Sequence, residues 1–219
     1  MGIEKYKMIA GLAEHRLVGI IRCSSEEEAV RKSESIIEGG IKILEVSLTT
    51  PGALQVINRL VKTKQKDVFI GAGTVLDSES ARACILAGSE FIIAPNLNRE
   101  MVFACNRYAV PCIPGVGSTT EVVRALEWGC DIVKAFPGSV LGTSFIKAVK
   151  GPVPQAEIIP VGGVSLSNIE DWFAAGAFAV ALGSALTHPS AGEDPETIRK
   201  NTGEVVELVN RLNSGRKLI

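Results

Sequence analysis

Short runs rich in β-branched residues recur along the whole chain, and helical patterns separate them. They read LVGIIR (17–22), IKILEVSL (41–48), VFIGAG (68–73), FIIAP (91–95), PCIPGV (111–116), DIVKAF (131–136), EIIPVGG (157–163) and AVALGS (179–184). Strict alternation of strand and helix predicts a parallel sheet with right-handed crossovers. Eight strand–helix units favour closure of that sheet into a (β/α)8 barrel.

An open doubly wound sheet is the main alternative to a barrel. The first strand–helix turn reads RCSSEEE and lacks the glycine-rich dinucleotide fingerprint of that fold. No linker or low-complexity stretch divides the chain. We therefore expect an α/β fold with a single TIM-barrel domain over residues 1–219, and an extra helix at about residues 4–14 before the first strand.

Capping residues predict where several helices begin. Ser25, Asp77, Asn98 and Ser118 each precede a helical pattern, and their side chains can accept a hydrogen bond from the first helical turn. Pro51 suits the first position of a further helix, because its missing N–H is not needed there. The last helix is expected from Pro195 to Leu212.

The composition excludes several classes of protein. A net charge of −1 gives no basic footprint, so we expect no nucleic-acid partner. No apolar run reaches the length of a membrane span, and the charged start MGIEKYKM is unlike a signal peptide. The five cysteines are scattered without a CxxC pair, which indicates reduced, mostly buried thiols and a cytoplasmic protein.

Two ionisable residues, Glu45 and Lys134, lie inside otherwise apolar strands. They belong to the second and sixth expected strands, and alternate strands of a barrel contribute to the same interior layer. The two side chains can therefore point at the axis from opposite walls. A structural salt bridge, or a lysine that extends outward between helices, would be the purely structural interpretations.

The functional interpretation of this pair is Schiff-base chemistry. Lys134 lies among Ile132, Val133, Ala135 and Phe136, and desolvation there disfavours its charged form and lowers its pKa. A neutral amine can attack a carbonyl, and the resulting Schiff base serves as an electron sink. The proton transfers need a nearby acid/base, for which Glu45 is the candidate. The pair suggests a Schiff-base lyase.

Glycine pairs follow the last two expected strands. Gly162 and Gly163 end the seventh strand, and Gly183 with Ser184 ends the eighth. Loops after strands 7 and 8 commonly hold a phosphate in this fold through backbone N–H groups. The alternative is that these glycines only turn the chain.

Two further residues lie at the expected mouth of the barrel. The hydroxyl of Thr74 could bind a carboxylate or only cap its turn, and Arg22 could bind an anionic group or form an ordinary surface ion pair. The two histidines, His15 and His188, have no carboxylate or cysteine at ligand spacing. We therefore expect no catalytic metal.

The ordered motifs resemble a known family. They are G-[IV]-x-x-[IL]-E-[VI] around Glu45, GAGTVL at 71–76, AP at 94–95, PG at 114–115, K-x-F-P at 134–137, GG-V at 162–164 and GS at 183–184. In this order and spacing, over about residues 15–190, the chain resembles the 2-keto-3-deoxy-6-phosphogluconate (KDPG) aldolases. These class I aldolases include 2-keto-4-hydroxyglutarate (KHG) and 2-keto-3-deoxy-6-phosphogalactonate aldolases.

The resemblance implies a role for each matching residue. Lys134 would be the Schiff-base lysine and Glu45 the acid/base. The remaining substrate-binding positions would be Thr74 and Pro95 around pyruvate, Phe136 beside the lysine, and Gly162, Gly163, Gly183 and Ser184 around the phosphate. It also implies a homotrimeric TIM barrel that acts on a keto-acid phosphate without a cofactor or metal.

The sequence departs from the gluconate-type pattern at two positions. Thr49 stands where that pattern has an arginine that clamps the pyruvate carboxylate, and Val161 stands where it has threonine. An arginine that ends the first strand and a valine before Gly-Gly resemble the galactonate branch. This implies that Arg22 takes over anion binding.

The expected reaction is reversible cleavage of KDPG to pyruvate and D-glyceraldehyde 3-phosphate. The same chemistry on KHG, giving pyruvate and glyoxylate, or on the 6-phosphogalactonate epimer is the first alternative. A phosphate-binding isomerase with Glu45 as base is the second, and a catalytically silent binding or assembly subunit is the third.

Overall fold

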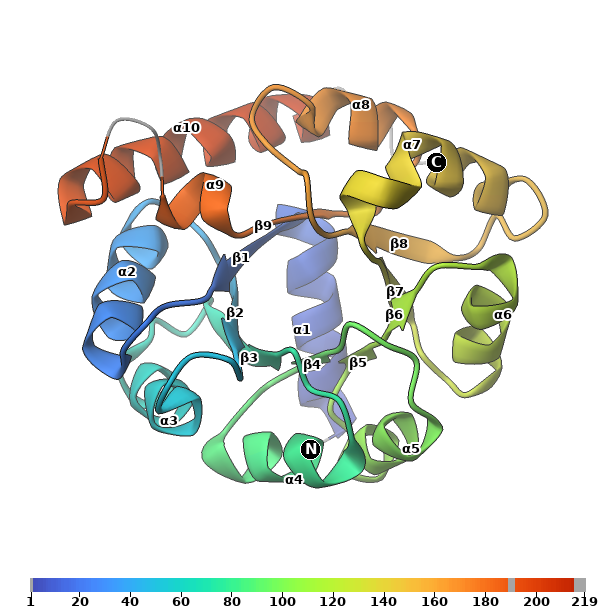
Figure 1. The fold of residues 1–219 in the computed structure, drawn as a ribbon, viewed down its shortest axis with the longest axis horizontal. Helices are drawn as coiled ribbons and strands as arrows, with labels where there is room; N and C mark the ends of the chain where they lie inside the picture. Colours follow the sequence, from blue (N-terminus) through green and yellow to red (C-terminus); the bar gives the residue numbers. More distant parts are fainter. Residues whose placement is uncertain (1, 189–191, 215–219) are drawn as a thin grey trace.

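The computed structural model describes residues 2–188 and 192–214, in which parallel strands line the centre and helices surround them (Figure 1). The strands are β1 (Leu17–Ile21), β2 (Ile43–Ser47), β3 (Phe69–Gly73), β4 (Ile92–Ile93), β5 (Cys112–Ile113), β6 (Gly115–Val116), β7 (Ile132–Ala135), β8 (Glu157–Pro160) and β9 (Val180–Leu182). The helices are α1 (Gly2–His15), α2 (Glu26–Glu38), α3 (Ala53–Thr63), α4 (Ser78–Ala87), α5 (Arg99–Arg107), α6 (Thr119–Glu127), α7 (Gly138–Lys150), α8 (Ile169–Ala174), α9 (Ser184–Thr187) and α10 (Pro195–Ser214).

The strands form two parallel sheets. One has six strands in the order β5-β4-β3-β2-β1-β9, and the other has three in the order β6-β7-β8. The predicted α/β alternation and parallel pairing are confirmed. The expectation of one continuous strand over PCIPGV is wrong, because Pro114 separates β5 from β6. Proline has no N–H to donate to a ladder, so regular pairing stops there.

Hydrogen bonds join the two sheets where β8 meets β9. The Phe178 N–H donates to the Ile158 carbonyl over 2.9 Å, and Val161 forms an isolated parallel bridge with Ala181. On the other side, the chain passes directly from β5 into β6, and the Gly115 N–H donates to the Asn96 carbonyl over 3.2 Å. The result is a pair of curled parallel sheets inside a ring of helices (Figure 1).

Apolar side chains are buried on both faces of the strands, as expected for a parallel sheet covered by helices. An outer cluster includes Ile21, Leu44 and Val133 and packs against the surrounding helices. A separate inner cluster contains the side chains that point to the centre, namely Val18, Ile20, Ile43, Phe91, Ile93, Ile113, Ile132, Ile159, Val161, Ala179 and Ala181. The strict alternation in the strands sends neighbouring residues to opposite clusters.

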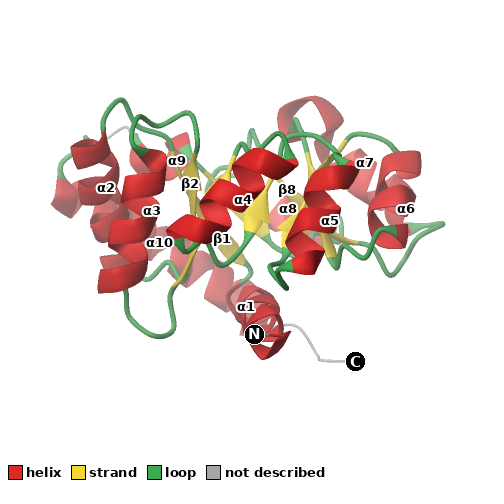
Figure 2. Ribbon diagram, turned by 90° about the horizontal axis from the view of Figure 1, so that it is seen from below, coloured by secondary structure: helices red, strands yellow, loops and turns green. Residues whose placement is uncertain are grey.

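Helix α1 closes one end of the inner cluster. Its Met8 and Leu12 are 1% and 0% exposed and belong to the same cluster as Val18 and Phe91. Figure 2 shows α1 beneath the strands and the other helices. Burial of each of these two side chains contributes about 1.5–3 kcal/mol before the entropic cost of ordering is subtracted. The expected N-terminal helix is therefore confirmed, and it plugs the centre.

Four predicted helix caps are confirmed. The side chains of Ser25, Asp77, Asn98 and Ser118 each accept a hydrogen bond from a backbone N–H in the first turn that follows. The helix expected from Pro51 begins instead at Ala53, because the preceding Gly52 takes up a left-handed conformation with φ of 70°.

Two further expectations concern the thiols and the membrane. Cys84, Cys105, Cys112 and Cys130 are buried and Cys23 is half-buried, and all five are unpaired, as predicted. Within residues 2–188 and 192–214, no helix combines the length and apolar character that crossing a bilayer requires.

Candidate active site

Glu45 and Lys134 both lie on inward-facing positions near the carboxyl ends of their strands. In β2, Glu45 is level with Ile20 of β1 and Gly71 of β3. In β7, Lys134 is level with Gly115 of β6. The two side chains therefore extend from separate sheets above the same apolar cluster.

Both charged groups are withdrawn from solvent, with exposed fractions of 1% for Glu45 and 4% for Lys134. Lys134 therefore does not extend outward between helices. Within the described residues, no hydrogen bond or ion pair joins the two groups, and Glu45 Oε2 has no hydrogen-bond partner. Neither of the purely structural interpretations matches this arrangement.

Burial changes the protonation of both groups in the direction that Schiff-base chemistry needs. Desolvation lowers the pKa of Lys134, although the Glu45 carboxylate opposes the shift, and Arg22 adds to the lowering. Desolvation raises the pKa of Glu45, against the attraction of Lys134 and Arg22. Burial thus favours the nucleophilic amine of Lys134 and makes the Glu45 carboxylate a stronger base.

The two glycines of the GAG segment leave room for their neighbours. A Cβ atom on Gly73 would lie 1.6 Å from Glu45 Oε1, and one on Gly71 would lie 2.4 Å from the ring of Phe91. No real side chain tolerates these approaches. Gly73 is therefore what allows the carboxyl group of Glu45 to occupy its position.

Three hydroxyl groups form a chain beside Glu45. Ser47 Oγ lies 2.8 Å from Thr49 Oγ1 and 2.9 Å from Thr74 Oγ1. Thr74 has a positive φ of 59°, which is uncommon for a residue with a β-branched side chain. Pro95 follows β4, and its carbonyl carbon would lie 2.3 Å from a Cβ on Gly115. Thr74 and Pro95 thus lie at the carboxyl ends of β3 and β4.

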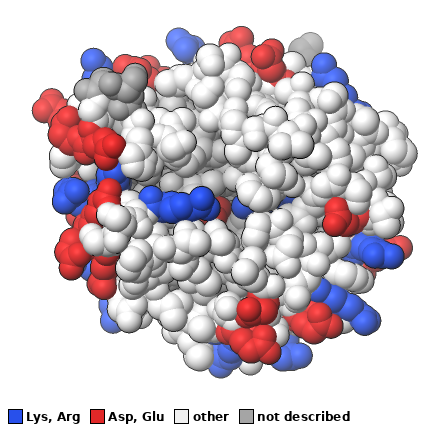
Figure 3. Space-filling view, in the orientation of Figure 1, with Lys and Arg blue, Asp and Glu red and all other residues white. Residues whose placement is uncertain are grey.

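A cavity of about 260 Å³ lies at the carboxyl ends of the strands next to Lys134, although neither Lys134 nor Glu45 lines it. Six predicted substrate-binding residues line it, namely Arg22, Phe136, Gly162, Gly163, Gly183 and Ser184. The Lys134 Nζ lies 4.7 Å from the centroid of the Phe136 ring, which connects the lysine to the cavity wall. In Figure 3, drawn from the side opposite α1, basic atoms lie within a hollow in a mostly uncharged face. Thr74 and Pro95 do not line this cavity.

Close packing explains the glycine pair after β8. Gly162 and Gly163 have φ values of 93° and 75°, a region that favours glycine. A Cβ on Gly163 would lie 3.0 Å from the Cβ of Ser139 near the start of α7. The loop therefore turns tightly and presents its backbone to the cavity.

Three residues of the site were missed from the sequence. Ser47 lacks a distinctive motif, and His188 was considered only as a metal ligand. Thr187 and His188 line the cavity because the chain forms the short helix α9 directly after Gly183, which the sequence pattern did not predict.

Glu28, His188 and Glu193 form a cluster whose ligand atoms lie within 4.8 Å of one another. Lys32 is 1% exposed, and its Nζ lies 3.0 Å from Glu28 and 2.8 Å from Glu193. The buried ammonium group therefore neutralises much of the charge that would attract a cation. In this structure the cluster is an ion-pair network that joins α2 to the segment before α10.

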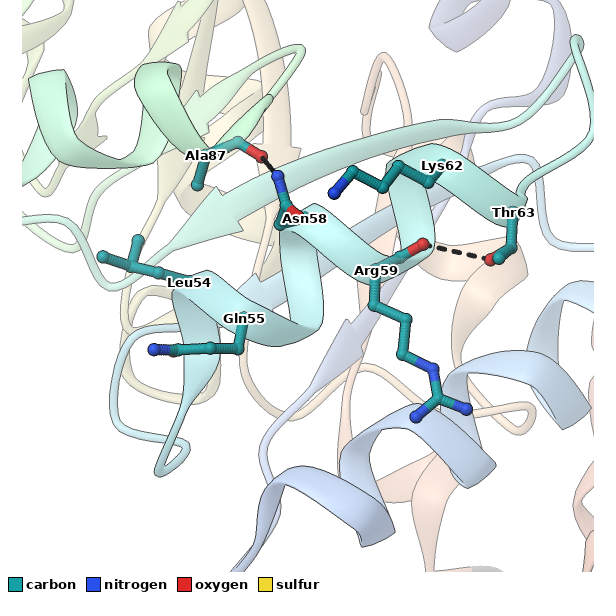
Figure 4. Close-up of a pocket in the computed structure, with 7 residues that line it drawn as sticks. All are labelled: Leu54, Gln55, Asn58, Arg59, Lys62, Thr63 and Ala87. Carbon is teal, nitrogen blue, oxygen red and sulfur yellow. Dashed lines mark hydrogen bonds between the residues drawn. The ribbon is translucent and has the colours of Figure 1, made fainter.

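A second, larger depression of about 510 Å³ lies on the outer surface of α3 (Figure 4). It is lined by Leu54, Gln55, Asn58, Arg59, Lys62, Thr63 and Ala87. All of these side chains are exposed or half-buried, and several are held by local hydrogen bonds such as Asn58 to the Ala87 carbonyl over 3.3 Å. It contains none of the predicted site residues, whereas the smaller cavity contains six of them.

Comparisons with known proteins agree with this geometry. The family model described as KDPG and KHG aldolase matches residues 8–201. A 2-dehydro-3-deoxy-phosphogluconate aldolase of Treponema pallidum is 36% identical over 73% of this chain and 76% of its own. A 2-dehydro-3-deoxy-6-phosphogalactonate aldolase of Escherichia coli is 32% identical over 87% of this chain and 93% of its own.

A solved structure gives the same result. The KDPG aldolase of Legionella pneumophila, with pyruvate captured as a covalent carbinolamine, has a TM-score of 0.77 and 32% identity. The match covers 91% of this chain and 95% of the other.

Proposed function

Because this chain belongs to the family of KDPG and KHG aldolases and is thus a carbon–carbon lyase, we propose that it cleaves KDPG reversibly to pyruvate and D-glyceraldehyde 3-phosphate. The observation that carries the proposal is the buried pair of Glu45 and Lys134, which form no hydrogen bond or ion pair with the described residues, together with the neighbouring cavity whose wall contains Phe136 and the glycine loops. The pair supports covalent carbonyl chemistry, and the glycine-rich walls support a phosphorylated substrate.

The proposed reaction begins at Lys134. Its neutral amine attacks the C2 ketone of the substrate to give a carbinolamine, which loses water to form an iminium ion. Glu45, through an intervening water, accepts the proton of the C4 hydroxyl as the C3–C4 bond breaks and the aldehyde departs. The electron pair of that bond enters the iminium as an enamine. Protonation at C3 and hydrolysis then release pyruvate and restore the amine.

The remaining residues bind the ends of the substrate in this proposal. Arg22, Thr74 and Pro95 surround the pyruvate half, and the ring of Phe136 packs beside the lysine. Gly162, Gly163, Gly183 and Ser184 hold the phosphate through their backbone N–H groups and the serine hydroxyl. The electrostatic influence of Arg22 on both Glu45 and Lys134 supports its position near the reacting carbons.

Three finer features belong to the same proposal. The hydrogen bonds between β8 and β9 support one closed (β/α)8 barrel over the whole chain. The resemblance to the family supports a homotrimer, which light scattering of the purified protein would test. The unpaired cysteines support a cytoplasmic location.

Borohydride trapping tests the mechanism. Incubation with pyruvate and borohydride should add one reduced pyruvate unit at Lys134, detected by mass spectrometry of a digest. Lys134→Met should abolish both the adduct and turnover, while Lys147→Met, at an exposed lysine of α7, should retain both. Turnover without any adduct would contradict the covalent mechanism.

The galactonate epimer is a second candidate substrate, because an arginine at the end of the first strand resembles the galactonate branch of the family. Arg22 is exposed at the cavity and has no ion pair in the described part of the chain, so it is free to bind an anionic group of that substrate. The ratio of kcat/KM for the two C4 epimers and for KHG identifies the preferred substrate.

A further inference from the structure

The cavity has an uneven distribution of charge. Among the side chains that line it, only Arg22 and His188 can carry a positive charge. Arg22 follows β1, which pairs with β2 so that Ile20 is level with Glu45. His188 instead acts electrostatically on Glu193, outside the strands. The two side chains come from segments that follow neighbouring strands, because Arg22 follows β1 and His188 lies after β9.

A phosphate monoester carries a charge between −1.5 and −2 at neutral pH. Backbone N–H groups of Gly162, Gly163 and Gly183 are neutral donors, and the Ser184 hydroxyl is neutral as well. A hydrogen bond is about twice as strong when one partner is ionised as when both are neutral, and a cationic donor adds a direct attraction between opposite charges. A cation beside the glycine loops would strengthen phosphate binding, and His188 lines the cavity two residues after the end of the turn over residues 183–186.

The ring of His188 is oriented by its neighbour. Its Nδ1 lies 2.8 Å from Thr187 Oγ1, and that hydroxyl donates its own proton to the Gly183 carbonyl over 3.3 Å. When the ring is protonated, Nδ1 donates to the Thr187 oxygen. This chain of hydrogen bonds fixes the ring relative to the loop that follows β9.

The second ring nitrogen makes no hydrogen bond within the described residues. His188 Nε2 lies 3.8 Å from Glu193 Oε1, which is longer than a hydrogen bond. Glu193 itself bonds to Lys32 over 2.8 Å, and Glu28 bonds to the same ammonium group. The His188 side chain is 47% exposed, so a ligand can reach it.

We propose that His188 is a specificity-determining residue that donates from Nε2 to the phosphate of the substrate. The inference rests on the proposed function. It attributes the enzyme's preference for phosphorylated over unphosphorylated keto acids to His188. The fixed Nδ1 contact leaves Nε2 as the donor when the ring is protonated, because both nitrogens of an imidazolium carry a proton.

The test compares His188→Gln and His188→Lys with the wild-type enzyme on KDPG and on unphosphorylated KHG. His188→Gln should raise KM for KDPG about tenfold, equivalent to about 1.4 kcal/mol, and leave kcat within about twofold. KM for KHG should stay within about twofold of wild type, and His188→Lys should recover most of the loss. The other histidine provides the control, because His15→Gln should change neither substrate.

Equal effects of His188→Gln on both substrates, or no effect on KDPG, would overturn the proposal. The proposed function fails separately, if wild-type protein forms no adduct with pyruvate or turns over neither substrate. Phosphate binding at His188 can also be measured without turnover, by an NMR titration of the histidine rings. Inorganic phosphate should move the imidazole NMR signals of His188 and leave those of His15 in place, and immobile His188 signals would refute the assignment.

Discussion

Replacement of Gly73 by alanine should inactivate the enzyme while leaving it folded. The added Cβ would lie 1.6 Å from Glu45 Oε1, 2.2 Å from Cδ and 2.4 Å from Cγ, so the carboxyl group must leave its position. Overpacking of this kind typically costs about 1–3 kcal/mol, against a total stability of about 5–15 kcal/mol. For a chain of this size the melting temperature should fall by about 2–12 °C.

The loss of activity should be much larger than the loss of stability. A positioned general acid/base contributes about 10²–10⁴-fold, and displacement by about 1 Å removes about 10²-fold. We therefore expect kcat/KM to fall at least about 10²-fold at a temperature where the variant is fully folded. Lys134 is untouched, so borohydride should still trap pyruvate.

Gly19→Ala is the matched control, since it adds the same methyl group to β1, two strands away from β3 in the same sheet. Its Cβ would lie 3.1 Å from Leu44 Cδ1, at the flexible end of a side chain in the outer cluster. It should lower the melting temperature slightly and retain activity. The reasoning is refuted if folded Gly73→Ala protein keeps kcat/KM within about threefold of wild type.

Three further measurements follow from burial and charge. Burial raises the pKa of Glu45 above its value in the unfolded chain, so its ionisation opposes folding, and the stability of wild type relative to Glu45→Gln should fall as the pH rises from about 4 to 7; thermal scans that stay parallel across this range would contradict it. Lys32→Met leaves Glu28 and Glu193 without their shared cation and should cost about 1–3 kcal/mol, since both carboxylates retain access to solvent; a melting temperature equal to that of Lys147→Met would show that the network does not stabilise the fold. Burial raises the pKa of Cys23 to about 11 and that of Cys84 to about 12, so thiols of the native protein should react slowly with a thiol reagent at pH 7.5. In denaturant, all five cysteines should react, one equivalent of reagent each. Rapid reaction of several thiols in the native protein would contradict this burial.

The general arrangement of the site follows from local patterns in the sequence. Period-two alternation places Glu45 and Lys134 on the inner face together with the apolar residues two positions before them, Ile43 and Ile132. The glycine pair at 162–163 is recognisable because a tight turn at the end of a strand favours glycine. These features depend on neighbours in the chain, and neighbours are visible in a sequence.

What the sequence could not reveal depends on contacts between distant segments. The need for Gly73 arises from the position of the Glu45 carboxyl on an adjacent strand, and the chain offers no local sign of it. His188 reaches the cavity only because α9 is a single short turn after Gly183. The separation of the strands at Pro114 depends on which partner each half pairs with across the sheet.

The α1 plug has a kinetic consequence for the proposed reaction. Because Met8 and Leu12 fill the far end of the interior, substrate and products in the proposed reaction pass through the cavity lined by the glycine loops. Pyruvate remains covalently attached to Lys134 at the bottom after the carbon–carbon bond breaks, while the aldehyde lies nearer the glycine loops at the entrance. The aldehyde must therefore depart first, and product release in the cleavage direction follows a fixed order.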